Sequence, residues 1–447
     1  MQKGQTGKMA RKRRKKKRGN RQWLKELGVV PLEDILPRRT RILGGVGPTP
    51  ISQGVLLALT RGLGIDHLGE PMSTVTTQIS QMTRLIFEVP DNYIALCSYG
   101  AATGAMEMAL NAAVWPGMQV LSCINGHFSR RMAEIAQRLG AVVKMVEVPL
   151  GQPITLEIVR KELEGNQPYS VLTIGHGETS TGVLSAETTA ICKLAKEKEL
   201  ITIVDGVCTI PCLPLSVAKS GVDICFGGAQ KGFASVPGAN PIVFSPEAWD
   251  RALRLPRPTP SYLLDPIAAY DFWMRKQYHV TAPVQVIFAL HTAMWEILSE
   301  GLSSFQRRHA VASRALQEGL EAAGFELYTP AEYRLPTAIA VRFGTPDGNG
   351  DSTRSQFRNA LKDQAGVVIA GAFGGLPIVR VGCMGWQATE KHIRTLLWAM
   401  ANRAKVFGID THRYHASVAV RRVFHDAGYA NPFKRGVPPE GIVRIAL

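Results

Sequence analysis

The sequence has no CxxC cysteine pair and no apolar run of 18 or more residues. Its seven cysteines are odd in number and scattered, mostly through apolar segments. This pattern argues against a disulfide framework or a zinc knuckle and fits reduced, buried thiols, so we expect no metal site and a cytoplasmic location. The missing apolar run argues against a transmembrane helix, and no apolar segment follows the basic N-terminus as it would in a signal peptide.

Acidic residues are absent from the first 25 positions, which hold 12 of the 52 basic residues, including the unbroken block 11–18. The rest of the chain has 40 basic residues against 36 acidic ones, so the formal charge of +16 belongs mainly to this segment. Because like charges repel, we expect residues 1–22 to form a disordered basic arm. The arm could bind nucleic acid or an anionic surface, or it could be only a solvated extension.

Hydrophobic residues make up 45% of the chain, which is enough for a sizeable core. Between residues 92 and 245, short apolar runs alternate with longer helical patterns. Strands are predicted at 93–100, 118–125, 142–148, 169–177, 200–207 and 223–230, and helices at 105–115, 128–140, 155–165 and 185–199. This alternation predicts βαβ units, and therefore an α/β fold with a mostly parallel sheet covered by helices.

The last third of the chain has a different pattern. Long helices are predicted at 283–301 and 305–324. They are followed by strands at 337–344 and 378–385 and by helices at 352–364 and 389–408, which together indicate a smaller α+β domain. Residues 409–447 show little helical periodicity, and we expect a tail of uncertain order.

Ligands of open parallel sheets bind at the carboxyl ends of the strands, so the residues that follow each predicted strand are candidates. Thr103 follows the first strand in a glycine turn that opens a helix, which suits a phosphate. His127 and Phe128 follow the second, and either could stack on a planar ring or pack in the core. A dense polar cluster follows the strand that begins at residue 169: His176, Glu178, Thr179, Ser180 and Thr181.

Asp205 and Lys231 end the next two apolar runs. A buried carboxylate requires a partner, although Asp205 could also cap the segment that follows it. A poorly solvated lysine has a lowered pKa and is an effective nucleophile, although Lys231 could also extend its amine to solvent. A phosphate cradle, a stacking aromatic, an aspartate and a lysine together predict a pyridoxal phosphate site, in which the lysine forms the Schiff base and the aspartate keeps the pyridine nitrogen protonated.

These residues lie within the segments "HGETSTG", "VDGV" and "GGAQKG", which are followed by "RLPT" and "RVG". In this order the segments resemble class V, fold type I aminotransferases, specifically the alanine–glyoxylate / serine–pyruvate aminotransferase family, from about residue 42 to residue 405. The resemblance implies a large domain with a mostly parallel, seven-stranded type of sheet and a smaller α+β C-terminal domain. The expected division is a segment at 23–60 that packs on both domains, a large domain at 61–300, a small domain at 301–408 and the tail at 409–447.

The resemblance also implies roles for individual residues. Lys231 is expected to be the Schiff-base lysine and Asp205 the pyridinium partner. The other implied cofactor contacts are Val207 under the ring, Phe128 stacked on it, Ser180 at the phenolic oxygen, Gln230, Ala102 and Thr103 at the phosphate, and Tyr278 and Thr281 from the neighbouring subunit. Arg380 is expected to bind the substrate α-carboxylate, and Gly45 belongs to the turn "GGVGPTP" that shapes the substrate pocket.

The implied activity is that of a homodimeric, pyridoxal phosphate-dependent transaminase. It would move an amino group from alanine or serine to glyoxylate or pyruvate, with Lys231 also acting as the general base at Cα. A lyase or desulfurase is an alternative, but desulfurases need a mobile cysteine, the loop 344–352 has none, and Cys383 lies in an apolar strand. A nucleic-acid-binding protein on a retired aminotransferase fold is a third interpretation, which only residues 11–18 support.

Overall fold

The computed structural model describes residues 27–37, 41–62, 64–165, 168–256, 258–343 and 350–429. The predicted basic arm, with its proposed contacts to nucleic acid or an anionic surface, therefore lies outside the described residues, as does most of the loop 344–352. The chain forms two compact units, 1–41 and 42–447. The described part of the first unit contains the short helix α2 (Leu32–Ile35), which has no buried residues.

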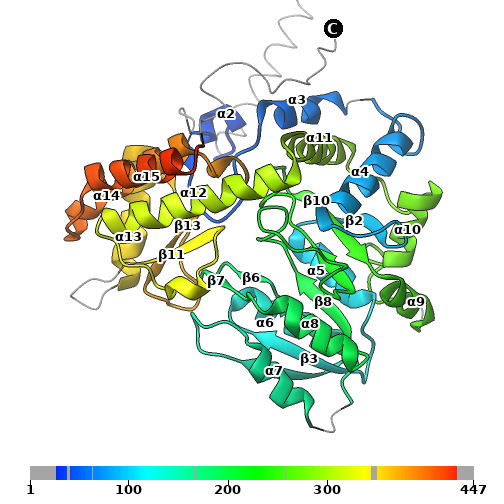
Figure 1. Cartoon of the computed structure of the whole chain (residues 1–447). Helices are drawn as coiled ribbons and strands as arrows, with labels where there is room; N and C mark the ends of the chain where they lie inside the picture. Colours follow the sequence, from blue (N-terminus) through cyan, green and yellow to red (C-terminus); the bar gives the residue numbers. More distant parts are fainter. Residues whose placement is uncertain are drawn as a thin grey trace, which may run out of the picture. The chain divides into compact units, whose positions relative to one another are not determined.

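A seven-stranded sheet lies at the centre of the second unit (Figure 1). In spatial order its strands are β2 (Ile94–Gly100), β10 (Gly238–Phe244), β9 (Ile224–Phe226), β8 (Ile201–Asp205), β5 (Val171–Gly175), β3 (Gln119–Ile124) and β4 (Val142–Glu147). Neighbouring strands are parallel except around β10, which runs antiparallel to both β2 and β9. The predicted mostly parallel, seven-stranded sheet is thus confirmed.

The central strands consist mainly of apolar residues because helices shield the sheet from water. Every residue of β5, β8 and β9 is buried, which is typical of a parallel sheet covered on both faces. The helices associated with this sheet are α4 (Met72–Phe87), α5 (Ala102–Asn111), α6 (His127–Arg138), α7 (Leu156–Leu163), α8 (Thr188–Glu197), α9 (Pro246–Arg254) and α10 (Pro266–Arg275). Among them, α5 packs on β2 and β10, and α6 packs on β3.

Two further helices connect the sheet with the rest of the unit. Helix α11 (Val284–Glu300) packs against α3 (Gln53–Arg61) and α4, and Ser52 caps α3 by accepting a hydrogen bond from the Val55 amide. Helix α12 (Leu302–Ala322) follows α11 and runs toward α14 and α15 (Figure 1). These helices therefore link two separate hydrophobic clusters.

The second hydrophobic cluster lies between α12 and the elements that follow it in the chain. These elements are β11 (Ala338–Arg342), α13 (Gly350–Ala365), β12 (Val367–Val368), β13 (Ile378–Gly382), α14 (Glu390–Ala404) and α15 (Arg413–Asp426). Strands β11 and β13 pair antiparallel, and β12 pairs in parallel with β1 (Ile42–Leu43). These elements form the mixture of helices and strands that the sequence predicted for the last third of the chain.

Helix α15 was not predicted. Its buried residues recur at helical spacing, at positions 416, 419, 420, 423 and 424, and they pack on α12 and α14. Arginine and histidine residues separate these apolar positions and obscure the pattern in the sequence. The expectation of little helical structure after residue 409 is therefore wrong for Arg413–Asp426.

Candidate active site

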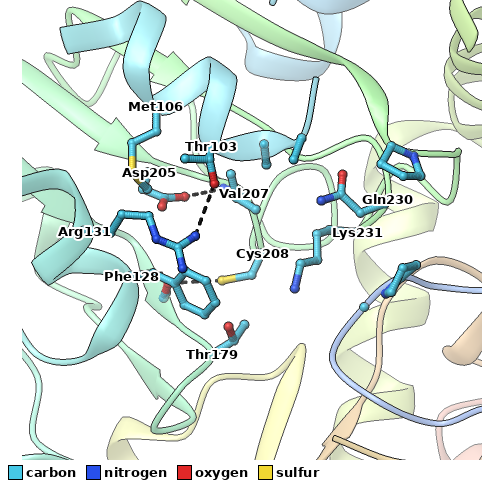
Figure 2. A pocket seen from close by; sticks show the side chains of 16 residues that line it. Thr103, Met106, Phe128, Arg131, Thr179, Asp205, Val207, Cys208, Gln230 and Lys231 are labelled. Atoms are coloured by element: carbon cyan, nitrogen blue, oxygen red, sulfur yellow. Dashed lines mark hydrogen bonds between the residues drawn. The ribbon is translucent and has the colours of Figure 1, made fainter. Parts of the chain in front are cut away.

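A cavity of about 310 Å³ opens at the carboxyl edge of the sheet (Figure 2). Its walls come from the turn after β2, the beginning of α6, the end of β8 and the turns that follow β8 and β9. The residues predicted to hold a cofactor that line this cavity are Ala102, Thr103, Phe128, Asp205, Val207, Gln230 and Lys231. The fold thus brings together side chains from four separate strand ends.

Lys231 lies in a turn rather than at a strand end, because β9 already stops at Phe226. Thr49 Oγ1 donates a hydrogen bond of 2.9 Å to the Lys231 carbonyl oxygen, and the lysine Nζ donates to the carbonyl of Val46. Burial lowers the pKa of the Lys231 amine, and the positive charge of Arg380 lowers it further. These effects favour the neutral amine, which is the form that attacks a carbonyl group.

Asp205 is the last residue of β8, and only 6% of it is exposed. Its Oδ1 accepts a hydrogen bond of 2.8 Å from the Val207 amide. Burial raises the pKa of Asp205 to about 7, although the Val207 hydrogen bond opposes this shift. The residues that follow form turns, so the alternative in which Asp205 caps a helix is wrong.

His127 and Phe128 are the first two residues of α6, and their side chains line different cavities. Phe128 lines the first cavity. His127 lines a second cavity, of about 380 Å³, and stacks on Phe373 with ring centroids 4.2 Å apart and ring planes at 6°. Phe128 is therefore the one of the two that can contact a ring in the first cavity.

The buried carboxylate of Glu178 holds the beginning of α6 in place. Its Oε2 accepts hydrogen bonds from the amides of Phe128 (2.9 Å) and Ser129 (3.0 Å), and its Oε1 accepts one from Ser180 N (2.9 Å). The Ser180 hydroxyl accepts a hydrogen bond from the His127 amide at 3.0 Å. Ser180 lines the second cavity, so its contact with a cofactor stays a prediction. The polar cluster noted in the sequence thus caps the helix that carries the aromatic residue.

Arg380, on β13, does not line the first cavity itself but bonds to a residue that does. Its Nε donates to the Gly371 carbonyl (2.6 Å) and its Nη1 to the Thr179 carbonyl (2.8 Å), and Thr179 itself lines the first cavity. Within the described part of the chain no group accepts a hydrogen bond from Nη2, which leaves this nitrogen for a ligand carboxylate. Burial lowers the pKa of Arg380 to about 10, so the guanidinium keeps its charge at neutral pH.

The structure does not place Gly45, Tyr278 or Thr281 in this cavity. The carbonyl of Gly45 accepts a hydrogen bond of 2.7 Å from Gln387 Nε2, and Gly47 lines the cavity in its stead. Tyr278 is 60% exposed and Thr281 is also exposed. The contact of these two residues with the cofactor phosphate of a neighbouring subunit therefore stays a prediction.

Arg131 and Cys208 are among the lining residues of the first cavity that sequence reasoning missed. Arg131 Nη1 donates to Thr103 Oγ1 at 3.2 Å, and its guanidinium carbon lies 5.0 Å from the centre of the Phe128 ring. The three-residue spacing from Phe128 on a helix was the available signal, because residues at this spacing share a face. The Cys208 thiol donates to the Gly177 carbonyl, and no pattern in the sequence pointed to it.

The sheet and its carboxyl-edge residues have the architecture of a fold type I aminotransferase, and solved aminotransferase structures superimpose on the chain. Ureidoglycine–glyoxylate aminotransferase of Bacillus subtilis has a TM-score of 0.81 at 26% identity, with 87% of this chain and 99% of that one covered. Alanine–glyoxylate aminotransferase of Nostoc sp. has a TM-score of 0.77 at 30% identity, with coverage of 83% and 96%.

The family is defined by sequence as well. The model of the class V aminotransferase family matches residues 58–370, and the chain belongs to this family. It is 28% identical to mouse alanine–glyoxylate aminotransferase over 387 residues, which cover 83% of this chain and 91% of the mouse protein. The protein is therefore an aminotransferase, as the sequence resemblance predicted. Among the described residues, no helix combines the length and apolar character needed to cross a membrane.

Proposed function

We propose that the enzyme binds pyridoxal phosphate in the first cavity and transfers an amino group from alanine or serine to glyoxylate or pyruvate. The observation that carries this proposal is the convergence of Lys231, Asp205 and Phe128 on one cavity, with Arg380 bonded to the carbonyl of Thr179, another residue of its lining. The names of the relatives suggest alanine and glyoxylate as substrates, and the resemblance noted in the sequence implied serine and pyruvate.

The residues of the cavity fit this cofactor. Gln230 lines the cavity, and the nitrogen of a carboxamide can donate a hydrogen bond to a phosphate oxygen. Helix α5 begins at Ala102, and its first amides together with the Thr103 hydroxyl suit a phosphate group. Val207 and Phe128 are apolar walls for an aromatic ring. We infer that Gln230, Ala102 and Thr103 hold the phosphate and that Asp205 faces the ring nitrogen.

When bound, pyridoxal phosphate supplies a ring that withdraws electrons from the Cα of the amino acid. Lys231 would hold the cofactor through its amine and then move the proton at Cα, a role that its lowered pKa favours. Asp205 stabilises positive charge on the ring nitrogen when the carboxyl is ionised. Arg380 orients the substrate by binding its carboxylate with an arginine that two backbone carbonyls hold in place.

We further propose that the enzyme is a homodimer in which Tyr278 and Thr281 reach the phosphate of the neighbouring subunit. The exposure of both residues in the single chain supports this arrangement. We also propose a division near residue 301 into a large and a small domain, which the two hydrophobic clusters support. All seven cysteines are free and buried, which supports a reducing, cytoplasmic location.

Absorbance spectroscopy of the purified protein tests the proposed activity. With pyridoxal phosphate bound we expect a visible absorption band that alanine or serine bleaches and that glyoxylate or pyruvate restores. Borohydride reduction followed by peptide mapping should find the cofactor attached to Lys231. A band that no amino acid bleaches would contradict the proposed substrates.

Lys231→Ala should lose the covalent attachment and nearly all turnover. The matched control is Lys276→Ala, because burial also lowers the pKa of Lys276 but its Nζ bonds to Thr76 and the Trp273 carbonyl, and it does not line the cavity. The control should keep both the band and the activity. If the Lys231 variant kept the covalent band, the assignment of the lysine would be wrong.

A further inference from the structure

Three aromatic rings separate the first cavity from the second. Phe128 lines the first cavity, whereas His127 and Phe373 line the second. The ring of Phe373 stacks on His127, as described, and meets Phe128 edge to face, with centroids 5.6 Å apart and planes at 85°. Phe373 comes from the loop between β12 and β13, and the other two rings come from α6. The wall between the cavities is therefore built from α6 and from the loop between β12 and β13.

Phe373 also contacts the residue proposed to bind the substrate carboxylate. The guanidinium carbon of Arg380 lies 4.8 Å from the centre of the Phe373 ring. Because Arg380 is held by the carbonyls of Gly371 and Thr179, its guanidinium cannot turn away without breaking those hydrogen bonds. An amino acid whose carboxylate binds Arg380 therefore lies beside the Phe373 ring.

We propose that Phe373 is a specificity-determining residue, which closes the substrate site against the second cavity and thereby restricts the amino donor to small side chains. This inference rests on the proposed function, since it requires that Arg380 binds the substrate carboxylate. A donor side chain that extends toward the second cavity meets the phenyl ring. Removal of the ring takes away one of the three rings between the two cavities, and the site gains room for a larger side chain.

The lining of the second cavity indicates which larger donors the opened site accepts. Pro149, Leu150 and Leu376 give it apolar walls. Its charged residues, Arg130 and Glu147, pair with each other at 2.5 Å, so neither offers a free charge to a ligand. The opened site should therefore favour apolar donors such as phenylalanine and leucine over glutamate.

The test compares Phe373→Ala with the wild-type holoenzyme, using alanine, phenylalanine and glutamate as donors and glyoxylate as the acceptor. We expect kcat/KM for phenylalanine relative to alanine to rise by about tenfold or more, because a cavity of altered size changes discrimination by this order. The ratio for glutamate should rise less. Absorbance titration of the bound cofactor with each amino acid gives the corresponding change in affinity without turnover.

Leu376→Ala is the matched control, because Leu376 lines the second cavity from the same loop and is not part of the stacked aromatic wall. It should leave the phenylalanine to alanine ratio within about threefold of wild type. If Phe373→Ala does not fold, as judged by thermal denaturation, Phe373→Leu is assayed instead and should shift the ratio in the same direction.

Two results would overturn the inference. In one, a folded Phe373 variant keeps the wild-type ratio. In the other, activity falls equally for all three donors, which would mean that the ring only orients Arg380. Failure of the proposed function is distinguishable from both, because the wild-type enzyme would then show no transamination with alanine or serine.

Discussion

Asp205→Asn separates the contribution of this residue to stability from its contribution to function. The carboxyl group is buried, and its Oδ1 accepts a hydrogen bond from the Val207 amide. Asparagine has nearly the same shape and keeps that acceptor, but it carries no ionisable group. We therefore expect the variant to be more stable than wild type without cofactor at pH 8, and to bind pyridoxal phosphate more weakly.

The magnitude follows from the pKa of Asp205, which burial raises from 3.8 to about 7. The folded state keeps its proton up to about pH 7, whereas the unfolded state loses it near pH 4. Protonation of Asp205 thus favours folding at low pH, and stability is lost as the pH rises from about 4 through 7. Each pKa unit corresponds to about 1.4 kcal/mol, so the ionised, buried carboxylate destabilises the fold by about 4 kcal/mol at pH 8. At pH 5 the same calculation gives about 2 kcal/mol.

Denaturant unfolding of both proteins without cofactor, at pH 5 and pH 8, measures this difference. The stability advantage of Asp205→Asn should be larger at pH 8 than at pH 5 by about 2–3 kcal/mol. The hydrogen bond from Val207 exists in both proteins and cancels. An advantage that is equal at the two pH values would refute the raised pKa, and with it the view that the fold holds this carboxylate at the expense of stability.

Two other substitutions test the supports of the site. Glu178→Ala removes the acceptor for the first amides of α6, so we expect a loss of about 2–3 kcal/mol in unfolding free energy and weaker cofactor binding in an absorbance titration, because Phe128 loses its position. Glu178→Gln should lose less, and equal losses would contradict the assigned role. Arg308→Met breaks a buried ion pair with Glu300 and should cost about 3 kcal/mol in denaturant unfolding, with kcat unchanged in cofactor-saturated enzyme. A changed kcat would contradict a purely structural role.

The parallel part of the sheet could be predicted because its strands are short apolar runs between helical patterns. Strand β10 could not, since Gly238 and Pro241 fall within it and both residues are rare in strand interiors. Pro241 is tolerated because its carbonyl still accepts a hydrogen bond from the Gly227 amide, while its missing N–H demands no partner. These residue preferences are statistical, and the pairing of β10 with β2 and β9 overrides them.

The site, like the sheet, has residues that could be predicted from the sequence and residues that could not. Asp205 was predictable because a strand end in a parallel sheet has a known place, and the same rule brought Thr103 and Phe128 to the same edge. The contact between Phe373 and His127 joins residues far apart in the sequence through a glycine-rich loop that has no periodicity. Such contacts depend on how the loop folds against α6, and neither composition nor spacing specifies that.

The buried charged groups of the site weaken the fold, but the same burial favours the binding of a ligand with complementary charges. Burial shifts the pKa of Asp205 upward and those of Lys231 and Arg380 downward, so in each case it disfavours the charged form. A ligand with a positive ring nitrogen and a carboxylate supplies opposite charges as partners for Asp205 and Arg380. Binding therefore recovers part of the desolvation cost of these groups, and the affinity for cofactor and substrate depends on the same burial that destabilises the protein without them.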